Sequence, residues 1–209
     1  MKILFIARNY PPSVGGAEKL NYDLANNLKK HVDVRIVANK FGKYSPIFHV
    51  YAFFKSIFAE KDIIFLSDPF LSPLIPLFKI FKKPIVIKVH GLDITYPNKI
   101  YQWAIPRLTN MVDKVICISR ATKEECVKRK IDSEKCVVIP VGIDCNEFFI
   151  DEDKGKLRRE LSQKLGVNLN NKKILLSVGR LVERKGFHWF IDKVMPLSLI
   201  HISEPTRPY

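Results

Sequence analysis

Six short runs rich in Ile and Val recur along this sequence, and a segment of helical length separates most of them from the next. They are Lys2–Ala7, Val32–Ala38, Asp62–Leu66, Pro84–His90, Lys114–Ser119 and Cys136–Pro140. Strands that are apolar at nearly every position are typical of parallel sheets with both faces covered. The alternation of such strands with helices predicts an α/β fold, a Rossmann-like doubly wound parallel sheet.

The segments between these runs predict five helices. They are Ala17–Lys30, one within Pro46–Ala59, Leu71–Phe81, Lys99–Thr109 and Arg120–Lys130. In the first helix Leu20, Leu24 and Leu28 recur at four-residue spacing, and we expect this stripe to face the sheet. The opposite face would carry Glu18, Tyr22, Asn26 and Lys29.

The composition changes after the sixth run. A charged stretch from Asp151 and a polar, turn-forming stretch from Val167 predict a first domain of residues 1–150 and a linker of residues 151–171. A strand at Lys173–Val178 and a helix from Phe187 would then make residues 172–196 the truncated start of a second Rossmann-like domain. Residues 197–209 resemble the in-frame translation of a sequencing-library adapter, and we expect them to be a technical artefact outside the fold.

The formal net charge is +14, from 35 Lys and Arg against 21 Asp and Glu, which predicts a surface that attracts anions. Nucleic acid, an acidic membrane surface and phosphorylated small molecules are the anionic partners that this charge allows. Dense basic clusters of the kind that bind nucleic acid are missing, because the Lys and Arg residues are spread along the chain. We therefore expect no nucleic-acid partner.

The four cysteines are Cys117, Cys126, Cys136 and Cys145. They form no C-x-x-C pair, so the sequence predicts neither a metal site nor a disulfide framework. The first apolar run is short and Arg8 follows it without a cleavage site, which indicates a strand and not a signal peptide. Prolines and charged residues interrupt the apolar region Ile63–Ile87, so no transmembrane helix is predicted. We expect a cytoplasmic protein.

Paired glycines, Gly15 and Gly16, stand between the first predicted strand and the first helix. Glycines at such a junction let backbone N–H groups approach a ligand closely, and the helix N-terminus behind them favours negative charge. A phosphate or sugar would fit there, and a tight turn without a ligand is the alternative. The loop lacks the G-x-G-x-x-G pattern, which disfavours a dehydrogenase.

Polar residues also follow the fourth and fifth predicted strands. His90 and Asp93 stand at the carboxyl end of the fourth, where open α/β sheets bind their ligands. After the fifth strand, Ser119 would cap the next helix and Arg120 would hold an anion. A structural role remains the alternative for His90.

A basic, glycine-containing loop follows the strand predicted at Lys173–Val178. Gly179 allows close approach of the backbone, and Arg180 and Lys185 together would neutralise a diphosphate. A solvated basic turn is the alternative. The sequence shows no nucleophile or acid–base set.

Taken in order, five segments resemble glycosyltransferase family 4, a group of retaining enzymes with the GT-B fold of two Rossmann-like domains. They are Tyr10-Pro11-Pro12 with Gly15–Glu18, His90–Asp93, Ile118–Arg120, Ile139–Asp144, and Gly179-Arg180 with Lys185-Gly186. The resemblance extends over Met1–Pro196. It implies a first, acceptor-side domain followed by part of the nucleotide-sugar-binding domain.

The resemblance also implies roles for the candidate residues. His90 would lie near the transferred sugar, Gly15 and Gly16 would face the donor, and Arg180 and Lys185 would hold its diphosphate. Further candidates for the cleft are Glu18, Asp93, Ser119, Arg120, Gly142, Asp144 and Gly179. The implied reaction transfers a sugar from a nucleotide-diphosphate sugar to a glycan or lipid-linked acceptor, with retention and without a metal or other cofactor.

The family's second domain continues to a loop with paired glutamates, which this sequence does not contain, so we expect the fragment to be inactive. Family members also dock on the inner face of the membrane, and Tyr44–Lys83 carries aromatic residues and lysines that would suit such docking, although most of these aromatics should be core. Two other functions remain open: a GT-B-fold nucleotide-sugar epimerase, and a non-catalytic module that binds an anionic membrane or nucleic acid.

Overall fold

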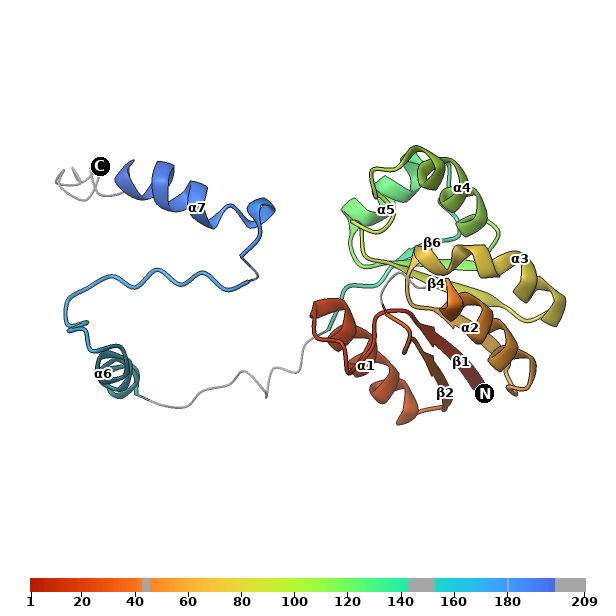
Figure 1. The fold of residues 1–209 in the computed structure, drawn as a ribbon, viewed down its shortest axis with the longest axis horizontal. Helices are drawn as coiled ribbons and strands as arrows, with labels where there is room; N and C mark the ends of the chain where they lie inside the picture. The colour runs from red at the N-terminus through yellow and green to blue at the C-terminus, as the bar shows by residue number, and fades with distance from the viewer. Residues whose placement is uncertain (43–45, 143–152, 180, 198–209) are drawn as a thin grey trace. The chain divides into compact units, whose positions relative to one another are not determined.

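Six parallel strands form one sheet in the first of the two units into which the chain divides, Met1–Ile143 and Asp144–Tyr209. The structure is a computed structural model that describes residues 1–42, 46–142, 153–179 and 181–197. The strands are β1 (Lys2–Ala7), β2 (Asp33–Ala38), β3 (Ile63–Leu66), β4 (Ile85–Val89), β5 (Lys114–Cys117) and β6 (Cys136–Val138). Their order is β2-β1-β3-β4-β5-β6 (Figure 1), which confirms the predicted doubly wound α/β fold.

The strand order reverses between β1 and β3. The chain runs from β1 outward to β2 and then returns to the other side of β1, where Ile3 pairs with Ile63 and Ile6 with Leu66. Open α/β sheets bind ligands at such a switch point, beyond the carboxyl ends of the strands. The residues that follow β1 and β3 therefore occupy the position where a ligand is expected.

Helices cover both faces of the sheet. The helices of this unit are α1 (Gly16–Lys29), α2 (Ile47–Ile57), α3 (Ile75–Phe78), α4 (Lys99–Thr109) and α5 (Arg120–Lys128). Leu4 and Ile6 of β1 point into the larger core cluster, to which α2 to α5 contribute. Ile3 and Phe5 point into the smaller cluster, which includes Ala25 of α1. This alternation explains why the strands are apolar at nearly every position.

Two details differ from the predicted helices. The helix expected at Leu71–Phe81 is a four-residue α3 between two 3₁₀ segments, Pro69–Leu74 and Lys79–Phe81. Prolines remove backbone donors from this stretch, which favours short 3₁₀ turns.

The other difference concerns the face that α1 turns to the sheet. The fully or nearly buried residues of α1 are Glu18, Asn21 and Ala25, whereas Leu24 and Leu28 are only partly buried at the margin of the smaller cluster. The prediction that Glu18 faces away from the sheet is therefore wrong, because its exposed fraction is 8%. The face that α1 buries is partly polar, since Asn21 has buried hydrogen-bond partners there.

The second unit contains helices but no strand among its described residues. Its elements are α6 (Lys154–Leu165), a 3₁₀ turn (Glu183–Lys185), and α7 (Phe187–Trp189), which continues as a π-helical segment (Phe190–Val194). The expected strand Lys173–Val178 is absent, and Leu176 and Val178 are 83% and 80% exposed. A strand needs a partner for its backbone N–H and C=O groups, and the described part of this unit offers none. The domain and linker bounds proposed from the sequence stay a prediction.

Candidate functional site

A buried ion pair joins the residues that follow β1 and β3 at the switch point. The Nε of Arg8 lies 3.1 and 3.2 Å from the two carboxylate oxygens of Asp68, and both side chains are more than nine-tenths buried. Asp68 also accepts hydrogen bonds from the hydroxyl of Ser67 and the backbone N–H of Phe70. The guanidinium carbon of Arg8 lies 4.3 Å from the centre of the Phe70 ring. Each charge is thus compensated inside the protein, as buried ions require.

His90 follows β4 and lies beside this pair. Its Nε2 lies 3.3 Å from the carbonyl oxygen of Ser67, so the two ends of neighbouring strands β3 and β4 are linked. Burial lowers the pKa of His90 to about 4, because the imidazolium ion loses its hydration, and the positive charge of Lys88 acts in the same direction. The ring of His90 is therefore neutral near pH 7.

Asp93 organises the turn after β4. Its carboxylate accepts hydrogen bonds from the backbone N–H of His90, at 3.0 and 2.9 Å, and from that of Ile94 at 2.9 Å. Burial raises the pKa of Asp93 to about 6, although these hydrogen bonds favour the charged form. Gly91 within the turn has a φ of 98°, a conformation that favours glycine. The structure therefore brings His90 and Asp93 together, and it assigns Asp93 contacts that hold the backbone of His90.

A second polar chain connects α1 to the sheet. The Nζ of Lys88, in β4, donates to Oδ1 of Asn21 at 2.6 Å, and Nδ2 of Asn21 donates to the carbonyl of Asn9 at 2.8 Å. Burial lowers the pKa of Lys88 to about 8, against the opposing effects of Asp68 and Asp93. This chain fixes α1 against the carboxyl ends of β1 and β4.

The glycine pair lies at the start of α1. Gly15 is the N-cap residue and Gly16 is the first residue of the helix. A Cβ atom at Gly15 would overlap Oε2 of Glu18, so the buried carboxylate of Glu18 lies against this glycine. A negative charge at this place is favoured by the dipole of α1. The N-terminal turn of α1 is thus occupied by an acidic side chain of the protein itself.

The other predicted site residues of the first unit have different surroundings. Oγ of Ser119 accepts a hydrogen bond from the backbone N–H of Thr122 at 3.1 Å, which is the contact of an N-cap residue of α5. Arg120 and Gly142 are exposed. Asp144 lies outside the described residues. Contacts of Ser119 are thus those of a helix cap, and no described contact ties Arg120 or Gly142 to His90.

The predicted diphosphate loop lies in the second unit. Gly179 and Lys185 are exposed, and Lys185 ends a 3₁₀ turn that is followed by Gly186 at a φ of 66°. Arg180 lies outside the described residues. The roles implied for these three residues stay predictions.

An aromatic cluster adjoins the Arg8–Asp68 pair. The ring centres of Phe70 and Tyr101 are 4.9 Å apart, and those of Tyr96 and Tyr101 are 5.3 Å apart. The hydroxyl of Tyr101 is buried and has no hydrogen-bond partner among the described residues, and the same is true of Oδ1 of Asn9. Burial, together with the nearby Asp93 and Asp68, raises the pKa of Tyr101. Buried polar atoms without partners are uncommon and are often completed by a ligand or water.

Sequence reasoning missed three charged residues of this site: Arg8, Asp68 and Lys88. A signal for each was available, because Arg8 and Asp68 stand within two residues of the ends of β1 and β3, and Lys88 interrupts the apolar strand β4. Charged residues at such positions are costly unless partners are provided. What the sequence does not show is which of them pair.

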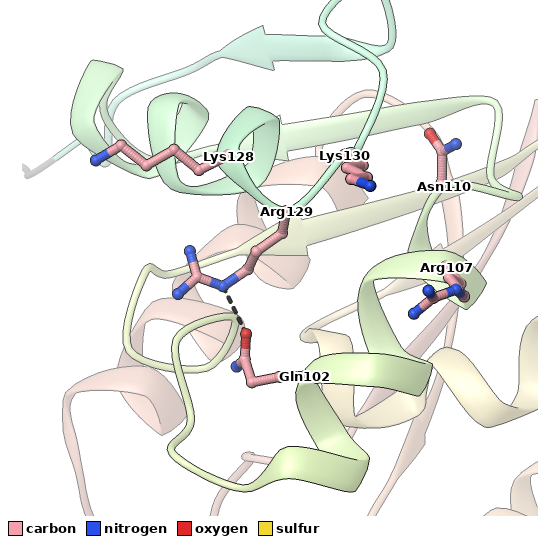
Figure 2. A pocket seen from close by; sticks show the side chains of 6 residues that line it. All are labelled: Gln102, Arg107, Asn110, Lys128, Arg129 and Lys130. Atoms are coloured by element: carbon pink, nitrogen blue, oxygen red, sulfur yellow. Dashed lines mark hydrogen bonds between the residues drawn. The ribbon is translucent and has the colours of Figure 1, made fainter.

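A basic hollow lies elsewhere in the first unit, between α4 and the end of α5 (Figure 2). Its volume is about 360 Å³, and its lining residues are Gln102, Arg107, Asn110, Lys128, Arg129 and Lys130. Three of these cations already have partners: Nε of Arg129 donates to Gln102 at 2.7 Å, Lys128 pairs with Glu125, and Arg107 donates to the carbonyl of Trp103. Cations in the last turns of α4 and α5 also compensate the helix dipoles. Contacts within the fold therefore account for three of the cations that line the hollow, without a ligand.

The described residues contain neither a candidate metal site nor a membrane-spanning helix. No three or more His, Cys, Asp and Glu side chains there are grouped so as to hold a metal ion. Within the same residues, no helix has the length and apolar composition needed to cross a membrane. Cys117, Cys126 and Cys136 are free and buried, and Cys145 lies outside the described residues.

Known glycosyltransferases and solved structures resemble this chain in sequence or fold. A galactosyltransferase of Escherichia coli, named UDP-Gal:alpha-D-GlcNAc-diphosphoundecaprenol alpha-1,3-galactosyltransferase, is 28% identical over 114 residues, which cover 52% of this chain and 28% of that protein. The structure of Anabaena HepE with UDP matches with a TM-score of 0.70 at 22% identity, over 94% of this chain and 58% of HepE. The lipopolysaccharide outer core galactosyltransferase WaaB matches with a TM-score of 0.50 at 19% identity, over 69% of this chain and 46% of WaaB.

The two structural matches show a shared fold. The chain spans little more than half the length of HepE and a smaller share of the other two proteins. The sequence profile named Glycosyltransferase Family 4 matches residues 43–147, which are 105 of the 209 residues. This region contains β3 to β6, with Asp68 after β3 and His90 and Asp93 after β4. The predicted family is thereby confirmed: the chain belongs to glycosyltransferase family 4, and its first unit is a Rossmann-like domain of the GT-B type.

Proposed function

We propose that this chain is the acceptor-side part of an enzyme that transfers a hexose from a UDP-sugar to a lipid-linked glycan, with retention of configuration. Membership of the family supports transfer from a nucleotide sugar. UDP is the nucleotide named for the relatives: HepE is described with UDP and UDP-glucose, and the Escherichia coli protein takes UDP-Gal and a GlcNAc-diphosphoundecaprenol acceptor. The observation that carries the proposal is the neutral, partly buried His90, which follows β4 beside the switch point of the sheet.

The contacts of the acidic residues argue against a covalent enzyme intermediate in the proposed retaining transfer. Asp68 is bound by Arg8, Ser67 and Phe70, and Asp93 is bound by the backbone N–H groups of His90 and Ile94. A carboxylate so engaged is poorly disposed to act as a nucleophile. In the proposed reaction, departure of UDP provides the driving force, and cations and helix dipoles stabilise its charge.

The donor would be held without a metal or other cofactor. Gly15 and Gly16 allow backbone approach at the positive end of α1, and Arg180 and Lys185 are proposed to neutralise the diphosphate. Glu18 lies at the N-terminal turn of α1, so it would have to move when phosphates bind there. Activity that survives a chelator such as EDTA would support this part of the proposal.

The lipid-linked acceptor implies contact with a membrane. An exposed stripe on α2 consists of Ile47, Val50, Phe54 and Phe58, which are 57% to 80% exposed. Lys55 lies on the same helix, and exposed Lys79, Lys82 and Lys83 follow α3. The prediction that most aromatics of this region are core agrees with the structure. Phe48 and Phe78 are buried, Tyr51, Phe53 and Phe81 pack partly buried against the core, and Phe54 and Phe58 are the exposed minority. We propose peripheral docking on the anionic inner face of the cell membrane, with the protein otherwise cytoplasmic.

The chain of 209 residues is proposed to be inactive by itself. The described residues of its second unit contain no strand, and Gly179 and Lys185 are exposed, so this described part has no sheet to position a diphosphate. Donor binding by a Rossmann-like domain depends on backbone groups fixed at strand and helix ends. We expect no release of UDP from a UDP-hexose by this chain, with or without acceptor.

The proposed function is tested with a longer protein in which residues 1–196 continue into a complete second Rossmann-like half. UDP release is measured from UDP-galactose and UDP-glucose, with and without GlcNAc-diphosphoundecaprenol. Release that requires the acceptor supports the transferase. Conversion of one UDP-sugar into another without acceptor would instead indicate an epimerase, and membrane binding without either reaction would indicate a binding module.

A further inference from the structure

The tautomer of the neutral His90 ring is set by a contact that needs no assumption about the ligand. Nε2 of His90 lies 3.3 Å from the carbonyl oxygen of Ser67. A carbonyl oxygen only accepts hydrogen bonds, so Nε2 must carry a proton. The neutral ring has one proton, and Nδ1 is then an unprotonated acceptor.

Ser67, whose carbonyl selects this tautomer, is itself held by several hydrogen bonds. The backbone N–H of Ser67 donates to the carbonyl of Ile6 at 3.0 Å. The hydroxyl of Ser67 accepts from the backbone N–H of Arg8 at 3.2 Å and donates to Oδ2 of Asp68 at 3.1 Å. Asp68 is fixed in turn by Nε of Arg8. Ser67 therefore has little freedom to rotate its carbonyl away from His90.

We propose that Asp68 is a positioning residue for His90: through Ser67, the Arg8–Asp68 ion pair holds His90 as the Nε2–H tautomer and leaves Nδ1 to accept a hydrogen bond from a sugar hydroxyl. Asp68 acts on His90 indirectly, because its hydrogen bonds among the described residues are with Arg8, Ser67 and Phe70. The interpretation of the ligand rests on the proposed function. The tautomer and its dependence on Asp68 do not.

The chemistry of the ligand contact follows from the tautomer. Nδ1 of His90 makes no hydrogen bond with the part of the chain that the structure describes. An unprotonated nitrogen accepts from a hydroxyl O–H and repels a phosphate oxygen, which has no proton to donate. His90 would therefore bind a hydroxyl of the sugar and not the diphosphate, and it would not act as a proton donor near pH 7.

Replacing Asp68 should not protonate the ring of His90, because of the charges that surround it. Lys88 and Arg8 disfavour the imidazolium, whereas Asp68 and the Ser67 carbonyl favour it. Removing the charge of Asp68 therefore lowers the pKa of His90 further. Any change of the ring nitrogens in an Asp68 variant at pH 7 then reports the tautomer.

The test is ¹⁵N NMR of the imidazole of His90 in this chain at pH 7, without donor or acceptor. In the unaltered chain we expect a single form, with Nε2 protonated and Nδ1 not. Asp68→Asn should convert it to a mixture of both tautomers, because an amide offers Arg8 only one acceptor atom and the Ser67 turn loosens. Ser67→Ala keeps the carbonyl but removes the hydroxyl link, so we expect a smaller shift in the same direction.

Glu60→Gln is the matched control, because it also neutralises an acid that pairs with a cation, but on the exposed surface. It should leave the His90 resonances unchanged. Amide spectra of each variant check that the sheet is intact, and Ser67→Ala serves if Asp68→Asn does not fold. A single Nε2–H form in both folded variants, or a Nδ1–H form in the unaltered chain, would overturn the proposal. Neither result would bear on sugar transfer, which is measured separately by UDP release.

Discussion

Arg8 and Asp68 are separated by 60 positions in the sequence, yet the Nε of Arg8 lies 3.1 Å from a carboxylate oxygen of Asp68 in the interior of the protein. The pair exists because β1 and β3 are neighbours in the sheet and both end at the same edge. It fills the switch point of a Rossmann-like domain with charge. Burial keeps the neighbouring His90 neutral, although Asp68 favours its imidazolium form.

Removing one partner of this pair should strongly destabilise the first unit. Arg8→Met leaves the carboxylate of Asp68 buried without its cation, and the loss of one partner of a buried pair costs about 3–5 kcal/mol. Urea denaturation followed by circular dichroism measures the change. Glu60→Gln, which breaks the exposed pair with Lys2, should cause little change. Equal effects of the two substitutions would contradict the assignment of Arg8 and Asp68 as a buried pair.

Lys88 should make stability depend on pH in the alkaline range. Its pKa is about 8 in the folded chain and 10.5 ordinarily, so between these values the unfolded chain binds more protons. The free energy of unfolding therefore increases as the pH rises from about 8 to 10.5. Denaturation curves measured across this range should show the increase, and Lys88→Met should remove it. An increase of the same size in Lys88→Met would mean that another group is responsible.

His90 and Asp93 should act in opposite directions at acidic pH. The pKa of His90 is lowered to about 4 from 6.5. Its contribution to the free energy of unfolding is therefore present above pH 6.5 and is lost as the pH falls towards 4. The pKa of Asp93 is raised to about 6 from 3.8, so its contribution is present below pH 3.8 and is lost as the pH rises through 6. In His90→Gln only the effect of Asp93 remains of the two, so the free energy of unfolding should decline as the pH rises from 4 to 6. A stability profile unchanged by His90→Gln would contradict the lowered pKa.

Gly91 and Gly16 should respond differently to alanine. Gly91 has a φ of 98°, and a side chain in this region costs about 1–3 kcal/mol. Gly16 begins α1, and a Cβ atom there meets nothing within 4 Å, so Gly16→Ala should stabilise the chain by about 0.4–1 kcal/mol. Thermal denaturation of the two variants gives the comparison. Stabilisation by Gly91→Ala would show that the turn after β4 is not held as described.

The exposed stripe of α2 should govern membrane binding. Phe58→Asp, at a residue 80% exposed, should reduce co-sedimentation with vesicles that contain anionic phospholipid, because it removes an apolar contact and adds a repelling charge. Val127→Asp, at a residue 41% exposed on α5, adds the same charge and serves as the control. Equal loss of binding in both variants would point to net charge alone, and no loss in either would remove α2 from the proposed docking surface.

Much of the first unit could be predicted from the sequence because its strands are apolar on both faces. The bounds of β1 and α4 agree with the predicted Lys2–Ala7 and Lys99–Thr109, and the other strands differ by one or two residues at their ends. The orientation of α1 could not be predicted from the spacing of its leucines. Asn21 is buried there because Lys88 of β4 and the carbonyl of Asn9 after β1 are its partners, and Lys88 is distant in the sequence.

The candidate site was predicted in its position but not in its contacts. His90 and Asp93 were found because they follow a strand, whereas Arg8, Asp68 and Lys88 resemble ordinary charged residues until the sheet brings them together. The strand expected at Lys173–Val178 was wrong for a related reason. Its Ile and Leu pattern is typical of a strand, but a strand forms only against a partner, and the described part of the second unit supplies none.

The most direct measurement is the transfer of labelled galactose from UDP-galactose to GlcNAc-diphosphoundecaprenol by the longer protein, compared with its His90→Ala variant. We expect labelled lipid product and one UDP released for each sugar transferred, with a loss of at least about tenfold in rate for His90→Ala. A longer protein that folds and binds UDP but forms no product from UDP-galactose or UDP-glucose would contradict the proposed reaction. Unchanged transfer by His90→Ala would show that the switch-point site is not where the sugar is transferred.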